Sequence, residues 1–82
     1  MAGITMEIIK RIAVIGDPEA GYKKELNLVS WNGAEPKIDI RTWSPNGVAL
    51  KGLALTESEA KDLYKALGNM FDEEYSTLAK AK

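Results

Sequence analysis

Residues 23–43 read KKELNLVSWNGAEPKIDIRTW, a stretch that predicts two β-strands joined by a short loop. Aliphatic residues alternate with polar ones in both strands, at Leu26, Leu28, Ile38 and Ile40. Successive side chains of a strand point to opposite faces of a sheet, so these positions mark the core side. Trp31 and Trp43 then fall on the other face, which we expect to meet solvent.

Two further apolar runs, one before and one after this stretch, complete a set of four predicted strands. We expect the strands at Glu7–Ile15, Tyr22–Trp31, Lys37–Trp43 and Val48–Leu55. The first run is rich in isoleucine and valine but alternates poorly, because apolar residues are adjacent at 8–9 and at 14–15. The short connections between the runs imply an antiparallel meander.

Glycine, asparagine and proline separate the predicted strands. Asn32 and Gly33 both tolerate positive φ and form a strong hairpin signal. Pro36 lacks the N–H that a ladder needs, so the third strand is expected to begin just after it. Gly52 interrupts the fourth strand, which often marks a bulge or a close approach of two backbones.

A helix follows the strands. Thr56 and Glu59 form a capping box, with the N-cap hydroxyl three residues before the carboxylate. Apolar residues then recur with helical spacing at Ala60, Leu63, Tyr64, Leu67, Met70, Phe71, Tyr75 and Leu78. The stripe crosses Gly68 without losing phase, which favours one helix to about Ala79. The alternative is a helix that ends at Gly68, followed by a second short helix.

These elements predict one α+β domain over residues 1–82, with the order ββββα, a core at about 7–68 and a helical extension at 69–82. The apolar stripe of the helix is expected to cover one face of the sheet. A chain of 82 residues buries only about 60% of its extended surface, so a homodimer is the expected way to enlarge the core. The expected dimer interface comprises Leu63, Leu67, Phe71 and Tyr75.

The composition argues against catalysis and against metal binding. The chain has no cysteine and no histidine, which removes disulfides, the usual metal ligands and the commonest general base. We therefore expect no cofactor, no metal, no small-molecule substrate and no enzymatic activity. No signal peptide and no apolar run of roughly 20 residues is evident, so we expect no membrane partner and a cytoplasmic location, associated with the nucleoid if the source is bacterial.

The face that carries the two tryptophans suggests nucleic-acid binding. An indole offers a flat surface on which an unpaired base can stack, and Lys37 and Arg41 beside it could meet phosphates. We expect Trp31 to lie opposite Lys37 in the hairpin. The net charge of −1 is spread unevenly, at +1 over residues 1–55 and −2 over 56–82.

Structural roles for the same residues stay open at this point. Trp31 could fold over the loop onto Pro36, and Trp43 could pack beneath the next turn or against a dimer partner. Asp39 would weaken a phosphate track unless it holds Arg41 in place. The alternative function is a homodimeric protein-interaction module that does not bind nucleic acid.

The stretches IDIRTW (38–43) and KGLALTESEA (51–60) resemble the positive cofactor four family of transcriptional coactivators, and in particular its small bacterial members. The resemblance spans about residues 23–67 and implies a homodimeric, whirly-like fold. It also implies binding of single-stranded DNA, and sometimes RNA, with little sequence preference, in transcription regulation, replication or repair. The candidate nucleic-acid-binding residues are Lys24, Asn27, Val29, Trp31, Asn32, Lys37, Arg41, Trp43 and Lys51.

Overall fold

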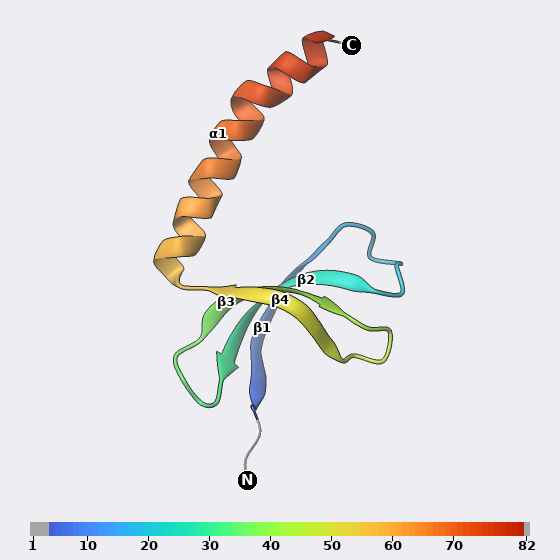
Figure 1. Cartoon of the computed structure of the whole chain (residues 1–82), viewed down its shortest axis with the longest axis vertical. Helices are drawn as coiled ribbons and strands as arrows, with labels where there is room; N and C mark the ends of the chain where they lie inside the picture. The colour runs from blue at the N-terminus through green and yellow to red at the C-terminus, as the bar shows by residue number, and fades with distance from the viewer. Residues whose placement is uncertain (1–3, 82) are drawn as a thin grey trace.

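The computed structural model describes the backbone of residues 4–81 and the side chains of residues 4–72. The elements are β1 (Met6–Ile15), β2 (Lys23–Trp31), β3 (Lys37–Trp43), β4 (Ala49–Leu55) and α1 (Glu57–Ala81). The four strands form one antiparallel sheet in the order β1-β2-β3-β4, and the helix leaves its last strand (Figure 1). The predicted ββββα order is confirmed. One helix passes through Gly68, as the unbroken stripe indicated.

The hairpin between β2 and β3 differs from expectation in its register. Val29 lies opposite Lys37, whereas we expected Trp31 there, so the prediction was wrong by two residues. The reason is the turn: the Ala34 N–H donates to the Trp31 carbonyl at 2.9 Å, with positive φ at Asn32 and Gly33. The two residues after this turn, Glu35 and Pro36, then stay outside the ladder between β2 and β3. A shift of two residues keeps every side chain on its predicted face.

Bulges distort both outer strands. The pairing of β1 with β2 shifts between Ile8 and Lys10, and again between Arg11 and Ala13, which explains the poor alternation of the first strand. The pairing of β3 with β4 shifts next to Gly52. A Cβ at Gly52 would overlap the Cβ of Arg41, so the predicted close backbone approach is confirmed. Bulges bend and twist the strands that carry them.

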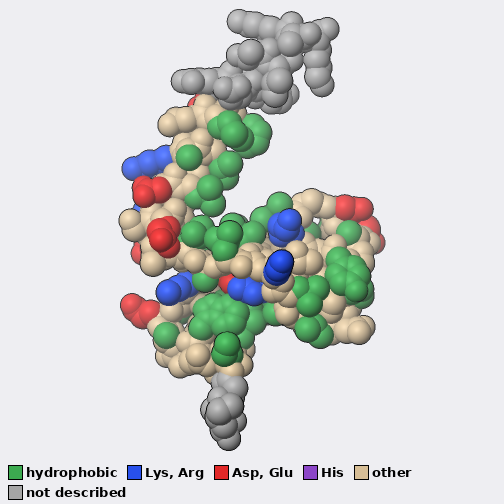
Figure 2. Space-filling model, in the orientation of Figure 1, with side chains coloured by type: hydrophobic (Ala, Val, Ile, Leu, Met, Phe, Trp, Pro, Cys, Tyr) green, Lys and Arg blue, Asp and Glu red, His purple; other side chains and the backbone are tan. Residues whose placement is uncertain are grey.

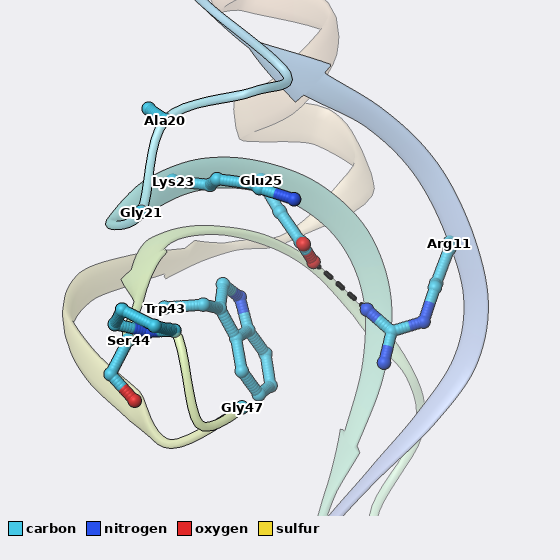
Figure 3. Close-up of a pocket in the computed structure, with 9 residues that line it drawn as sticks. Arg11, Ala20, Gly21, Lys23, Glu25, Trp43, Ser44 and Gly47 are labelled. Carbon is cyan, nitrogen blue, oxygen red and sulfur yellow. Dashed lines mark hydrogen bonds and ion pairs between the residues drawn. The ribbon is translucent and has the colours of Figure 1, made fainter.

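The buried centre of the chain lies on the sheet face that we expected to meet solvent. This tryptophan face carries Asn27, Val29, Trp31, Asp39, Arg41 and Trp43. Val29 is 0% exposed and Trp43 is 9% exposed, so the expectation of two solvent-facing indoles was wrong for Trp43. Trp31 is half-buried. The physical reason is curvature, because the bent strands arch around the Trp43 side chain (Figure 3), and an arginine lies against each indole of this face.

The opposite face of the sheet is apolar and largely uncovered. We call it the helix face. Its side chains and those of the first turns of α1 line an open groove of about 350 Å³. The helix leans away from the sheet, so the expectation that its stripe covers this face was wrong for a single chain (Figure 1). Hydrophobic side chains line the inner side of the angle between helix and sheet (Figure 2), and Phe71 is 58% exposed.

The start of α1 is fixed by the predicted capping box. The Thr56 N–H donates to Glu59 Oε1 at 2.8 Å, and the Glu59 N–H donates to Thr56 Oγ1 at 3.1 Å. Two of the N–H groups at the N-terminal end of the helix, which have no partner within the helix, are thereby satisfied. The Cα radius of gyration is 15.7 Å, against about 12 Å for a compact chain of this length.

Candidate nucleic-acid interface

One end of the tryptophan face is built around Trp31 and Arg41. The centre of the Arg41 guanidinium lies 4.8 Å from the centroid of the Trp31 ring, within cation–π distance. Arg41 donates from Nε to Asp39 Oδ1 at 2.7 Å and from Nη2 to Asp39 Oδ2 at 2.9 Å. Asp39 is fully buried and stands two residues before Arg41 on β3. The sequence had left open whether Asp39 holds Arg41, and the geometry shows that it does.

The bulge in β4 gives Arg41 a third partner. Its Nη1 donates to the Leu50 carbonyl at 2.8 Å, beside the register shift at Gly52. Three of the five guanidinium N–H groups are thus occupied within the chain, and the Arg41 side chain is only 14% exposed. A bidentate pair of this kind fixes both position and orientation. Arg41 is therefore a fixed element against the Trp31 ring and not a mobile surface charge.

The other end of the tryptophan face holds a pocket of about 360 Å³ beside Trp43 (Figure 3). It lies between the β1–β2 loop and the β3–β4 loop. Arg11 reaches over from β1, with its guanidinium carbon 5.9 Å from the centroid of the Trp43 ring. The Arg11 Nη1 donates to Glu25 Oε1 at 2.9 Å, and the same oxygen accepts from Asn27 Nδ2 at 3.1 Å. Both tryptophans thus lie beside an arginine that is paired with a carboxylate.

The two indole N–H groups share an unusual feature. Nε1 of Trp31 and Nε1 of Trp43 are both buried and have no hydrogen-bond partner among the described residues. An unsatisfied buried donor costs about 1–3 kcal/mol, so native structures seldom keep one without a reason.

The remaining candidate residues are dispersed. Lys37 is exposed and lies opposite Val29, near the Trp31 end of the face. Lys24 pairs with Thr42 in the register that places it on the helix face, away from the tryptophans. The Asn32 side chain accepts from the Thr5 N–H at 2.8 Å and so ties down the chain before β1. The other candidates are placed as follows: Lys51 is exposed on β4, and Asn27 and Val29 are buried in the tryptophan face.

Two cations of the tryptophan face, Arg11 and Lys23, were not among the predicted residues. Lys23 was predictable, because the period-two pattern places it on the same face as Trp31. Arg11 was not, because two bulges decide which way it points and the sequence of β1 shows no clear alternation. Of the expected dimer residues, Leu63, Leu67 and Phe71 are exposed on α1, and Tyr75 lies outside the described side chains.

Two classes of site find no support in the described part of the chain. No cluster of three acidic, histidine or cysteine side chains that could hold a metal ion is found among those residues. No described helix combines the length and the apolar character that a membrane span requires.

The element order and the two arginine-paired tryptophans define a small, single-sheet module of the ββββα class. The chain belongs to the transcriptional coactivator p15 (PC4) family, whose sequence profile matches residues 19–66. This confirms the resemblance to positive cofactor four. The family binds nucleic acid and is not enzymatic, and membership suggests single-stranded DNA binding and a transcription-related role. β1, with Arg11, lies before the matched range.

A protein of Treponema pallidum (strain Nichols) is similar to this chain. The two are 35% identical over 65 residues, which cover 78% of this chain and 76% of the treponemal protein. That relative is named only as an uncharacterized protein, so it carries no function over.

Proposed function

We propose that this protein binds single-stranded DNA, and also RNA, without sequence specificity, as a homodimer in the cytoplasm, in transcription regulation, replication or repair. The observation that carries the proposal is the arrangement of Trp31, Arg41 and Asp39. An indole held in one orientation by a buried ion pair is pre-organised to receive a base. Family membership supports the class of ligand.

Base stacking is assigned mainly to Trp31. Arg41 occupies one side of this half-buried ring, so a base would stack on the part that is left accessible. Such a stack is worth about 1–3 kcal/mol and is insensitive to the identity of the base. Lys37 is exposed near this end of the face and would meet a phosphate. Arg41 would act by positioning the indole, since its charge is balanced by Asp39.

The homodimer is proposed on the helix face. The chain exposes 6517 Å², against about 4,900 Å² for a compact protein of 9.0 kDa. The excess of about 1,600 Å² per chain, or about 3,200 Å² for two chains, falls in the range of about 2,000–5,000 Å² that an obligate homodimer interface buries in total. The open groove beside α1 is apolar and offers a second copy the same surface in return, which suits a two-fold contact.

Tryptophan fluorescence titrated with a dT oligonucleotide and with an rU oligonucleotide tests the proposal. We expect quenching that saturates at a fixed number of strands per dimer, and an affinity that falls with salt because phosphate contacts release counterions. If the wild-type protein shows no quenching and does not comigrate with either oligonucleotide, the proposal of nucleic-acid binding is wrong. The alternative, a dimeric protein-interaction module, would then stand.

A further inference from the structure

We propose that the pocket beside Trp43 is a further nucleotide subsite, in which Arg11 and Lys23 bind a phosphate group of the single strand. This inference rests on the proposed function and adds two residues to it. Arg11 lies on β1, which carries none of the candidate residues from the sequence, and Lys23 is the first residue of β2. The pocket has a volume of about 360 Å³ and opens between two loops (Figure 3).

The charge of the pocket suits an anion. Its lining includes two cations, Arg11 and Lys23, and one carboxylate, Glu25. The Arg11 side chain is 65% exposed and donates one of its five N–H groups to Glu25. Its other N–H groups can donate to a ligand. Lys23 makes no ion pair with any of the side chains at 4–72. The acidic residues of the β1–β2 loop, Asp17 and Glu19, do not line the pocket.

The walls of the pocket leave room and supply a further donor. Three lining residues are small: Ala20, Gly21 and Gly47. The Ser44 hydroxyl oxygen accepts from the Val48 N–H at 3.0 Å, and the hydroxyl can still donate its own hydrogen to a ligand. Trp43 closes one side, with its ring mostly buried. A phosphate therefore fits this pocket better than a base, since little of the Trp43 ring is open to stacking.

The two arginines of the tryptophan face differ in a way that separates their roles. Arg41 makes three hydrogen bonds and is 14% exposed, whereas Arg11 makes one and is 65% exposed. Arg11 holds Glu25 through a single contact, and Glu25, whose side chain is 17% exposed, would keep the hydrogen bond from Asn27 Nδ2 if Arg11 exchanged it for a phosphate oxygen. If Arg41 moved away from Asp39, a fully buried carboxylate would lose its ion pair, which is strongly destabilising.

The position of the pocket fits an extended ligand. Lys23 and Trp31 are the two ends of β2, eight residue steps apart, which is at most roughly 26 Å because the strand is bent. A single strand stacked on Trp31 would follow the face to the pocket at its other end. The subsite thus sets the length of nucleic acid that one subunit contacts.

The test uses Arg11→Gln, Lys23→Gln and the double variant, with Lys65→Gln as the matched control. Lys65 lies on the polar side of α1, so its substitution removes one charge far from the sheet. Affinity for a dT oligonucleotide is measured across a salt series. We expect the double variant to bind at least tenfold more weakly at low salt, and its log–log salt slope to be shallower by about 0.7, since the two residues share one phosphate and each phosphate neutralised on a single strand contributes about 0.7.

A second readout isolates the pocket. In a Trp31→Phe background the emission reports on Trp43 alone, and we expect dT to change that emission only while Arg11 and Lys23 are present. If wild type binds dT but the double variant keeps the affinity and slope of Lys65→Gln, the subsite is wrong while the proposed function stands. If wild type does not bind, both fall together.

Discussion

Arg41 forms two parallel hydrogen bonds with Asp39, at 2.7 and 2.9 Å, while its guanidinium lies 4.8 Å from the Trp31 ring centroid. A buried carboxylate thus fixes the cation that fixes the indole. The charge of Arg41 is balanced by Asp39 inside the protein, so we expect Arg41 to contribute to binding by orienting the Trp31 ring. If Asp39 is replaced by a neutral residue, the loss of its charge and the loss of its contact with Arg41 are expected to change the affinity for DNA in opposite directions.

Asp39→Asn removes a negative charge from the face that would meet phosphates. If charge alone mattered, binding to dT would tighten. We expect it to weaken by about tenfold, because the bidentate contact that holds Arg41 against Trp31 is lost. Unfolding free energy should also fall by about 3 kcal/mol, the usual cost of breaking a buried pair. Urea unfolding and a fluorescence titration on the folded fraction measure the two effects.

Arg41→Lys serves as the companion variant. A lysine keeps the positive charge but cannot make the planar two-point contact with Asp39. We expect the salt slope of dT binding to match wild type while the affinity drops. An affinity equal to that of wild type would instead identify Arg41 as a charge contact to a phosphate, which a lysine can replace, and would contradict the positioning role.

The two tryptophans are predicted to respond differently to truncation. Trp31→Ala should weaken dT binding by about 1–3 kcal/mol with a small effect on stability, because the ring is half-buried. Trp43→Ala should instead lower the unfolding free energy by about 3–5 kcal/mol, because it empties a buried site. Thermal unfolding followed by circular dichroism, paired with the dT titration, separates the two. Equal losses of stability in both variants would contradict the assigned roles.

Gly52 and Gly68 offer a matched pair of glycine substitutions. Gly52→Ala would place a methyl group into the backbone and Cβ of Arg41, so we expect it to unfold the protein or destabilise it by more than about 2 kcal/mol. Gly68→Ala meets open space within α1 and should stabilise by about 0.5–1 kcal/mol. Melting temperatures of the two variants check the prediction. A tolerated Gly52→Ala would show that the bulge can relax away from Arg41.

The helix face supplies a prediction on assembly. Leu67→Asp puts a charge on the apolar side of α1, where we propose that a second copy binds, so the dimer should dissociate or weaken at least tenfold. Lys65→Asp, on the polar side of the same helix, is the control and should remain dimeric. Sedimentation velocity over a range of concentrations measures both. A wild-type protein that sediments as a monomer at all concentrations would refute the proposed dimer outright.

The sequence alone determined the elements and their order. Period-two alternation in residues 23–43, the Asn32–Gly33 turn and the Thr56–Glu59 capping box are local signals, so each could be read without knowing what lies next to it in space. The stripe across Gly68 likewise predicted one helix, and the structure has one. Even the grouping of side chains by face was correct, because an error of two residues in register leaves every face unchanged.

Only the tertiary structure decided which face is buried. Aliphatic residues marked the helix face as the core side, yet Val29, Asp39 and Trp43 are the buried centre of the chain. Bulges in β1 and β4 bend the sheet around the tryptophan face, and curvature is a property of paired strands that no single strand reveals. The same bulges bring Arg11 to Trp43 and the Leu50 carbonyl to Arg41, since where an extra residue enters a ladder depends on its partner strand.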